Sequence, residues 1–358
     1  MRPALDVLLF SDYSIQELVE LAELSEALGC QRFWYTDVRF ARECYIALTA
    51  VALRTRTIKL GPGVTDPYSR HPAITASAIA TLDEVSGGRA LLGLGTGGTG
   101  FRELGIETKL PVAAMRETVE VIRALLRGGE VTAEGKVISL KGGRLLFDPV
   151  KREIPIYFAT HGPQITALGG RIADGVMIAN TLNPKAFDFY AHKVAEGMAK
   201  EGRTEGSVDL CLRVEACISD NDEAAFEVMQ RRVTSRVLSQ YPHWDYLTEL
   251  GIELPPELIA IAEQKKPIGQ AARLMPRAVV ESMALGGNAE RCAAQLATAL
   301  DSRITSVTVR PHAVAGETIA SVLKIFAEKV FPLALDLRSA TADARPSQAL
   351  HPPQPSDH

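Results

Sequence analysis

Eight short apolar runs recur along this chain of 358 residues, and each is followed by a stretch of helical periodicity. Short apolar runs of this kind are typical of parallel strands that are covered on both faces. Strands that alternate with helices build parallel sheets, and eight such units close into a barrel. The sequence therefore predicts an α/β fold, a (β/α)8 TIM barrel. The predicted strands are centred on Asp6, Trp34, Leu60, Leu92, Ile156, Met177, Val214 and Val307.

Two segments interrupt this alternation. Residues 131–147 predict a hairpin decoration in which Lys141-Gly142-Gly143 forms the turn. Residues 239–277, after the seventh strand, contain prolines between short amphipathic pieces, which predicts a helical insertion. Such an insertion is a lid, an oligomer contact or an inert excursion. We expect one domain over residues 1–337 and a disordered tail over residues 338–358, where apolar periodicity is absent.

Whole-chain properties narrow the class of protein. A net charge of −4 and a pI near 6.0 give no reason to expect binding to nucleic acid or to an anionic membrane. The five cysteines are scattered and form no CxxC pair, so we expect reduced thiols in the cytoplasm. The sequence contains neither a leader pattern nor a long apolar run, so we expect neither export nor a membrane span. No metal-ligand cluster is present, and no metal is expected.

Two consecutive junctions between strand and helix are rich in glycine. The strand at Leu60 ends in Gly61-Pro62-Gly63-Val64-Thr65, and the strand at Leu92 opens into Gly95-Thr96-Gly97-Gly98. A planar ligand can press against backbone that carries so few side chains. Ligands of parallel α/β folds sit at these carboxyl ends of the strands. Either loop alone is explained as a tight turn, but the pair favours a binding face.

Two acidic residues stand out beside these loops. Asp6 interrupts an apolar strand, so its carboxylate must find a partner or a wet cavity. It is a strand-start charge exposed at the bottom of the barrel, a structurally paired charge, or an acid that faces the active site. Asp37 directly follows the strand at Trp34. It either caps a helix or hydrogen-bonds within the loop, or it contacts a ligand. His71 precedes the helix-opening Pro72, which favours a cap residue over a site residue.

Five segments together resemble the luciferase-like monooxygenase superfamily over residues 4–335. They are ALDVLL, FWYTD, the block from Gly61 to Gly98, FATHGPQITALGGRIADGVMIAN and LGGNAERCAAQL. Within that superfamily the chain resembles the branch typified by methylenetetrahydromethanopterin reductase, which uses the deazaflavin coenzyme F420. The resemblance implies a barrel of the bacterial luciferase-like type, with a deazaflavin or a flavin at the carboxyl ends of the strands.

The resemblance also implies roles for matching residues. Asp37 would hydrogen-bond the cofactor, and Gly63 and Val64, joined by a cis peptide, would form a bulge behind its ring. Thr65, Thr96, Gly97 and Gly98 would line the ring and its side chain. A helix N-terminus would hold the cofactor phosphate through backbone N–H groups of Ala159, Thr160, His161, Gly162, Pro163 and Gln164. His161 departs from the smaller or amide residue expected there. Asp6 would face the substrate as the catalytic residue.

We therefore expect an oxidoreductase that transfers hydride between coenzyme F420 and a small organic substrate. The enzymatic alternative is an FMN-dependent monooxygenase that uses molecular oxygen. The non-enzymatic alternative is a flavin-binding barrel without turnover. The expected assembly is a homodimer or a higher homo-oligomer.

Overall fold

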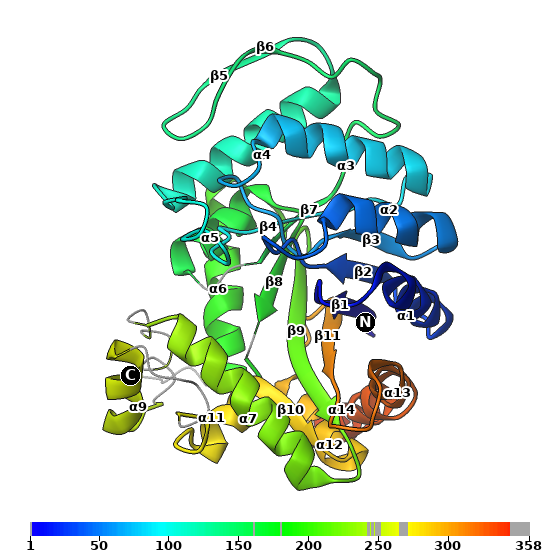
Figure 1. Ribbon diagram of the computed structural model, residues 1–358, viewed down its shortest axis with the longest axis vertical. Coiled ribbons are helices and arrows are strands. Elements are labelled where there is room, and N and C mark those ends of the chain that lie inside the picture. The colour runs from blue at the N-terminus through cyan, green and yellow to red at the C-terminus, as the bar shows by residue number, and fades with distance from the viewer. Residues whose placement is uncertain are drawn as a thin grey trace, which may run out of the picture.

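Eight parallel strands form a barrel in the computed structural model, which describes residues 2–159, 162–179, 181–241, 244, 247, 252–264 and 271–343. The strands pair in the order β3-β2-β1-β11-β9-β8-β7-β4 (Figure 1). Bridges from Leu60 to Ala90 and from Thr65 to Leu94 join the two ends of this order. The predicted barrel is thus confirmed. Its strands are β1 (Ala4–Leu9), β2 (Arg32–Tyr35), β3 (Lys59–Pro62), β4 (Leu92–Leu94), β7 (Ile156–Ala159), β8 (Gly175–Ala179), β9 (Asp209–Ile218) and β11 (Ser306–His312).

Helices follow the strands and cover the outside of the barrel (Figure 1). Several begin at residues that the sequence marks as caps; Ser14, for example, accepts a hydrogen bond from the backbone of Glu17 at 3.2 Å. None of the described helices is long and apolar enough to cross a membrane. The helices are α1 (Ile15–Ala27), α2 (Cys44–Arg54), α3 (Pro72–Ser86), α4 (Pro111–Arg127), α5 (Pro163–Ile172), α6 (Pro184–Lys200), α7 (Asp222–Ser239), α9 (Pro256–Glu263), α11 (Arg277–Met283), α12 (Ala289–Ala299), α13 (Ile319–Ile325), the π-helical η1 (Phe326–Val330) and α14 (Phe331–Asp343).

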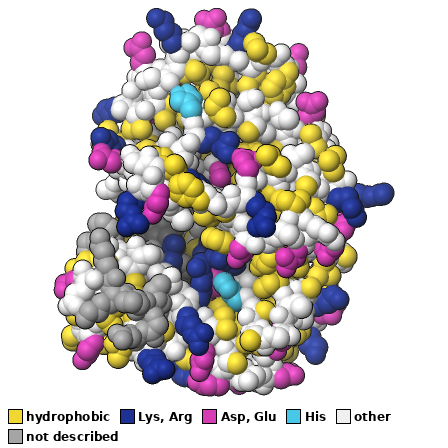
Figure 2. Space-filling view, viewed as in Figure 1, with side chains coloured by type: hydrophobic (Ala, Val, Ile, Leu, Met, Phe, Trp, Pro, Cys, Tyr) yellow, Lys and Arg dark blue, Asp and Glu magenta, His cyan; other side chains and the backbone are white. Residues whose placement is uncertain are grey.

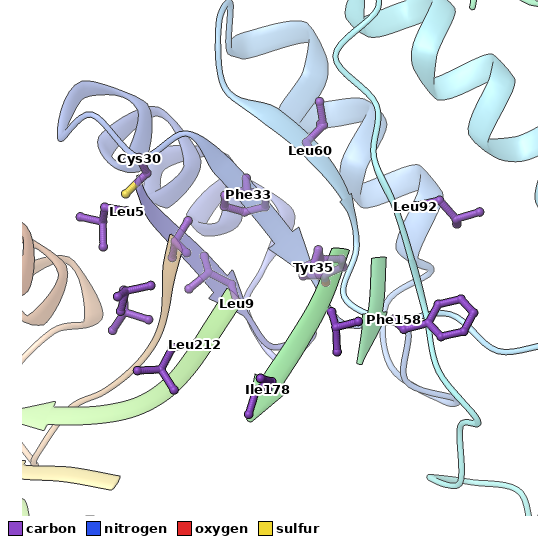
Figure 3. Close-up of a cluster of buried hydrophobic side chains, with 14 of the residues drawn as sticks. Leu5, Leu9, Cys30, Phe33, Tyr35, Leu60, Leu92, Phe158, Ile178 and Leu212 are labelled. Atoms are coloured by element: carbon purple, nitrogen blue, oxygen red, sulfur yellow. The ribbon is translucent and has the colours of Figure 1, made fainter. Parts of the chain in front are cut away.

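The strands bury side chains on both faces. Outward-facing residues such as Leu5, Leu9 and Phe33 pack in the core shared with the helices (Figure 3). A separate cluster fills the inside of the barrel with Leu8, Trp34, Leu91, Tyr157, Met177 and Cys211. Side chains alternate between these two clusters because strand residues point to opposite faces in turn. The barrel interior is therefore packed, and a ligand must sit at the ends of the strands.

The predicted hairpin is present, but its predicted turn is wrong. The strands β5 (Val131–Glu134) and β6 (Ser139–Gly143) pair antiparallel, so the turn spans residues 135–138 and Lys141–Gly143 lie within β6. The carboxylate of Glu117 on α4 accepts hydrogen bonds from the backbone of Lys136, Val137 and Ile138, each at 3.0 Å. This contact between distant segments fixes the position of the turn. The two glycines at positions 142 and 143, on which the prediction is based, carry no information about it.

The segment after β9 carries the predicted insertion, with α9 among its described residues. A short strand that was not predicted, β10 (Ala284–Gly287), follows α11 and pairs with the end of β9. The boundary predicted at residue 338 is wrong in one respect, because α14 continues to Asp343. The first turn of α14 packs in the core through Phe331 and Ala334. This packing supports the helix beyond residue 337, where the apolar periodicity of the sequence ends. Residues 344–358 lie outside the described residues.

Candidate active site

Backbone rather than side chains forms the surface where β3 and β4 end. A Cβ atom on Gly95 would lie 2.6 Å from Cγ2 of Val64 and 3.2 Å from the carbonyl oxygen of Ala159. A Cβ atom on Gly63 would lie 2.8 Å from Cβ of Trp34. Both glycines are buried, so the close packing of neighbouring strands excludes side chains there. We call the strand ends at Gly63–Thr65 and Gly95–Gly98 the glycine surface. The Gly63–Val64 peptide is cis, as the resemblance predicted.

Asp37 lies beside this surface at the end of β2. Its Oδ2 atom accepts a hydrogen bond of 2.7 Å from the hydroxyl of Thr65. Arg39 lies 3.7 Å from its other oxygen and Arg70 lies 3.9 Å from Oδ2. Arg39 also binds Asp66, and Arg70 binds Glu43 at 2.6 Å. The carboxylate of Asp37 is thus held in place while part of it stays exposed to solvent.

The other predicted cofactor residues surround the same surface. Thr96 is half-buried, Gly97 and Gly98 are exposed, and Gly97 adopts a φ of 69°, which favours glycine. Ala159 ends β7, and α5 begins after Gly162 with Pro163 and Gln164 exposed in its first turn. The structure therefore brings the predicted residues of β3, β4 and β7 together. Thr160 and His161 lie outside the described residues.

His71 is a cap residue, as the sequence favoured. Its Nδ1 atom accepts a hydrogen bond of 3.1 Å from the backbone of Ala73, which begins α3. Its Nε2 atom lies 3.0 Å from the carbonyl oxygen of Ser139 and donates to it. His71 therefore ties the hairpin to α3.

Asp6 lies lower in the barrel and is fully buried. Its Oδ2 atom accepts a hydrogen bond of 3.2 Å from Arg32, which also binds Asp209 at 2.7 Å. Of the structural alternatives, Asp6 is therefore paired and not exposed, and the sequence did not identify Arg32 as its partner. Leu8, the next inward-facing residue of β1, and Trp34 both lie close to Gly63, so they separate Asp6 from the glycine surface on that side.

The other oxygen of Asp6 has a different environment. Oδ1 of Asp6 and Oγ1 of Thr308, on paired positions of β1 and β11, are buried without a hydrogen-bond partner among the described residues. Burial raises the pKa of Asp6, and the charge and hydrogen bonds of Arg32 and Ser306 oppose that rise only in part. The catalytic role of Asp6 stays a prediction.

A second buried carboxylate, Glu215, was not predicted as a site residue. It lies on β9 near the carboxyl ends of the strands and is only 3% exposed. His312 donates to its Oε2 atom at 2.6 Å, because a carboxylate only accepts. The guanidinium groups of Arg213, Arg232 and Arg310 approach it within 3.1, 3.2 and 3.4 Å. We call these five residues the Glu215 cluster.

Charges dominate the energetics of the Glu215 cluster. Burial alone raises the pKa of Glu215, but Arg310, His312, Arg213 and Arg232 together hold it well below its ordinary value. Burial, together with the neighbouring Arg232 and Arg213, lowers the pKa of Arg310 to about 10, although Glu215 opposes this shift. A sequence signal existed for this cluster. Charges recur at every second position, at Arg213 and Glu215 within the predicted strand at Val214, and at Arg310 and His312 directly after the predicted strand at Val307.

A model of the luciferase-like monooxygenase family matches residues 7–306 of the chain. Two similar proteins are named 5,10-methylenetetrahydromethanopterin reductase. The one from Methanolobus tindarius is 34% identical over 82% of this chain and 89% of its own length. The one from Archaeoglobus fulgidus is 41% identical over 60% of this chain, and the match spans 64% of that relative.

A protein from Nocardia farcinica named F420-dependent glucose-6-phosphate dehydrogenase is 33% identical over 59% of this chain and 68% of its own length. Among solved structures, the coenzyme F420 dependent tetrahydromethanopterin reductase from Methanopyrus kandleri superposes with a TM-score of 0.81. It shares 28% sequence identity, and the match covers 93% of this chain and 99% of that one. The extent of the family match, together with these relatives, establishes that the chain belongs to the luciferase-like monooxygenase family.

Proposed function

We propose that this protein is an oxidoreductase that transfers hydride between coenzyme F420 and a small organic substrate. The observation that carries the proposal is the partly exposed carboxylate of Asp37, which Thr65 holds at 2.7 Å beside the ends of β3 and β4, where Gly97 and Gly98 expose backbone. Backbone that carries so few side chains can accept a planar ring. The relatives named as F420-dependent enzymes support the choice of deazaflavin. When bound, coenzyme F420 would supply or accept the hydride.

The chain's own residues would hold and orient that cofactor. Asp37, fixed by Thr65 at 2.7 Å, would accept a hydrogen bond from its ring or ribityl chain. The cis bulge at Gly63–Val64 would support the back of the ring, with Thr65, Thr96, Gly97 and Gly98 along its edge. The N-terminus of α5 would take the phosphate, since unpaired N–H groups and the helix dipole favour an anion there. Ala159, Thr160, His161, Gly162, Pro163 and Gln164 complete this proposed set.

We propose Asp6 as the acid of the reaction, which would hold a proton for the substrate. The support is its unpartnered Oδ1 atom and its raised pKa, since both are features of a carboxyl group that exchanges a proton. The pairing with Arg32, and the side chains of Leu8 and Trp34 between Asp6 and the glycine surface, support the structural alternative instead. A substitution that keeps the shape of Asp6 separates the two roles, and its expected effects are given in the Discussion.

A homodimer is the proposed assembly. Ile46 and Leu53 on α2 are each 70% exposed, and Ile74 on the neighbouring helix α3 is 57% exposed. Large apolar side chains exposed together mark a surface that another chain covers. Figure 2 shows hydrophobic side chains across the upper right of the molecule, the side where Figure 1 places these helices. We also propose a cytoplasmic location, because all five cysteines are buried and free.

Cofactor titration tests the proposed function. Purified protein is titrated with F420 and with FMN under absorbance and fluorescence, and any retained cofactor is identified by mass spectrometry. We expect F420 to bind and FMN to bind far more weakly. Asp37→Ala should weaken F420 binding by about 1–3 kcal/mol, the cost of a lost hydrogen bond to a partly buried carboxylate. The control Asp188→Ala alters an exposed carboxylate on α6 and should leave the affinity unchanged.

Selective retention of FMN would replace the proposal with the monooxygenase alternative. Unchanged F420 affinity in a folded Asp37→Ala variant would remove Asp37 from the site. Cofactor binding without turnover on any F420-linked substrate would favour the non-catalytic barrel.

A further inference from the structure

The charges of the Glu215 cluster do not balance. Arg232 and Arg310 both pair with Glu215, and within the described ranges no other carboxylate lies within 4.0 Å of either guanidinium. One negative charge therefore serves at least two permanent positive charges. A pair that served stability alone would need one arginine, because each further buried cation adds a desolvation cost without a partner.

Arg232 is the more accessible of the two surplus cations, because the side chain of Arg310 is only 10% exposed. The side chain of Arg232 is 29% exposed and that of His312 is 19% exposed, whereas Glu215 is hidden beneath them. Arg310 lies 4.6 Å from the ring of Phe10, which holds its guanidinium at the end of β1. Figure 2 shows basic side chains and a histidine in a hollow below the middle of the view.

The Glu215 cluster occupies the half of the barrel face that the cofactor does not need. The proposed cofactor residues follow β2, β3, β4 and β7, whereas the cluster is carried by β9, β11 and α7. In the sheet order β8 separates β7 from β9, and β1 separates β2 from β11. A group bound at the cluster would thus face the cofactor across the mouth of the barrel. We infer that the Glu215 cluster binds an anionic group of the substrate, a carboxylate or a phosphate.

This inference rests on the proposed function in one respect, because it takes the bound anion to belong to the molecule that gives or receives the hydride. The chemistry of the binding is independent of it. Arginine presents a planar fork of N–H donors that matches both carboxylate and phosphate oxygens. His312 keeps its Nε2–H on Glu215, so the arginines are the groups that meet the anion. The inference therefore predicts a substrate that carries a negative charge at neutral pH.

Anion titration with inorganic phosphate and, separately, with acetate tests this inference by calorimetry. We compare the parent protein with Arg232→Gln, Arg232→Lys and Arg231→Gln. Arg231 is adjacent on α7 but 68% exposed and paired with Glu227, so it is a matched control. Arg232→Gln should weaken binding of the preferred anion by about 10-fold or more, as expected for a charge-assisted hydrogen bond. Arg232→Lys should recover part of that loss, and Arg231→Gln should change nothing. Circular dichroism checks that each variant is folded.

F420 affinity is measured on the same variants and should stay within about two-fold of the parent, since the cofactor lies elsewhere. Phosphate preference supports a phosphorylated substrate, and acetate preference supports a carboxylate. Absence of binding for both anions, or equal losses in Arg231→Gln and Arg232→Gln, would overturn the inference. So would a parallel loss of F420 affinity, which would assign the cluster to the cofactor. A protein that binds phosphate as expected but never binds F420 would refute the proposed function and leave the anion site standing.

Discussion

Two buried carboxylates face the inside of this barrel, and their surroundings differ sharply. Glu215, near the carboxyl ends of the strands, accepts hydrogen bonds from an arginine on each of its oxygens, and its pKa lies well below the ordinary value despite burial. Asp6, near the amino ends, has a donor on Oδ2 alone, and burial raises its pKa. The same chemical group is a fixed anion at one end and a group that readily keeps its proton at the other.

The number of neighbouring charges explains this difference. At the floor of the barrel Arg32 lies between two carboxylates, those of Asp6 and Asp209. At the mouth Arg232 and Arg310 share Glu215. Burial penalises every charge unless opposite charges surround it. At the floor one arginine is shared by two carboxylates, so a carboxylate there lacks a full partner, whereas at the mouth one carboxylate is shared by two arginines, so an arginine lacks one. The floor is therefore suited to hold a proton and the mouth to hold an anion.

The largest expected effect is on Glu215. Glu215→Gln should lower the free energy of unfolding by about 3–5 kcal/mol, because it leaves buried cations without their counter-charge. Urea denaturation at neutral pH measures this. The control Glu227→Gln, on the exposed side of α7, should cost less than about 1 kcal/mol. A loss for Glu215→Gln as small as that of the control would mean that the cations do not depend on Glu215, and the comparison would fail.

Residues that act through local chemistry were predictable from the sequence. The glycines at positions 63 and 95, the cap at His71 and the strand-end position of Asp37 all follow from patterns within a few residues. The barrel was predictable as well, because each unit repeats the same alternation of strand and helix. The cis bond at Gly63–Val64 was expected from the family resemblance alone.

Features that depend on distant partners escaped prediction. Arg32 and Asp6 are 26 positions apart, and Glu215 and His312 are 97 apart, so no local pattern links them. The turn at residues 135–138 is fixed by Glu117 on another element. Charged residues at alternate positions of a buried strand were the available signal for the Glu215 cluster. That pattern requires partners across the barrel, but it does not say which ones.

The second prediction concerns Asp6, whose effect should appear in chemistry rather than in stability. Asp6→Asn keeps an oxygen for Arg32 and removes the titratable group. If Asp6 holds a proton for the substrate, turnover should fall by about 10²-fold, the lower end for positioned acid–base groups, with F420 affinity unchanged. Kinetics on a confirmed substrate measure this. Turnover within a few-fold of the parent would leave Asp6 with the structural role alone.

The stability of the same variant provides an independent check. The folded pKa of Asp6 is raised above its ordinary value of 3.8, so its contribution to stability is present below that pH and is lost as pH rises through the folded pKa. At neutral pH the uncharged amide of the Asp6→Asn variant avoids the cost of a buried charge. Urea denaturation should therefore show Asp6→Asn to be no less stable than the parent. A clear loss of stability would show that ionised Asp6 stabilises the floor after all.

The third prediction uses pH to separate the two carboxylates. Because the folded pKa of Glu215 is lowered, its contribution is present above the ordinary value of 4.5 and is lost as pH falls through the folded pKa. His312 adds a loss of the same sign below pH 6.5 in the parent and in Glu215→Gln, since burial lowers the pKa of its ring, and Glu215 opposes this shift only in the parent. The contribution of Glu215 itself is therefore read below pH 4.5. The arginines of the cluster keep their charge throughout this range. Urea denaturation at several pH values should show the stability advantage of the parent over Glu215→Gln shrinking in acid. An advantage that stays constant from pH 7 to the acid limit would contradict the lowered pKa of Glu215.

The smallest expected effect is at the edge of the floor, on Tyr157. Its hydroxyl donates a hydrogen bond of 2.6 Å to Asp209, and its ring packs against Trp34 and Arg32. Tyr157→Phe removes the hydroxyl and keeps the ring. Because Asp209 is partly exposed, water can replace the lost donor, so the free energy of unfolding should fall by only about 1 kcal/mol. F420 affinity and phosphate affinity should not change, since both proposed sites lie at the opposite end of the strands. A fall in turnover of about ten-fold or more with unchanged stability would contradict this expectation. It would mean that water at Asp209 cannot replace the Tyr157 hydroxyl in the reaction, and that residues of the floor other than Asp6 take part in catalysis.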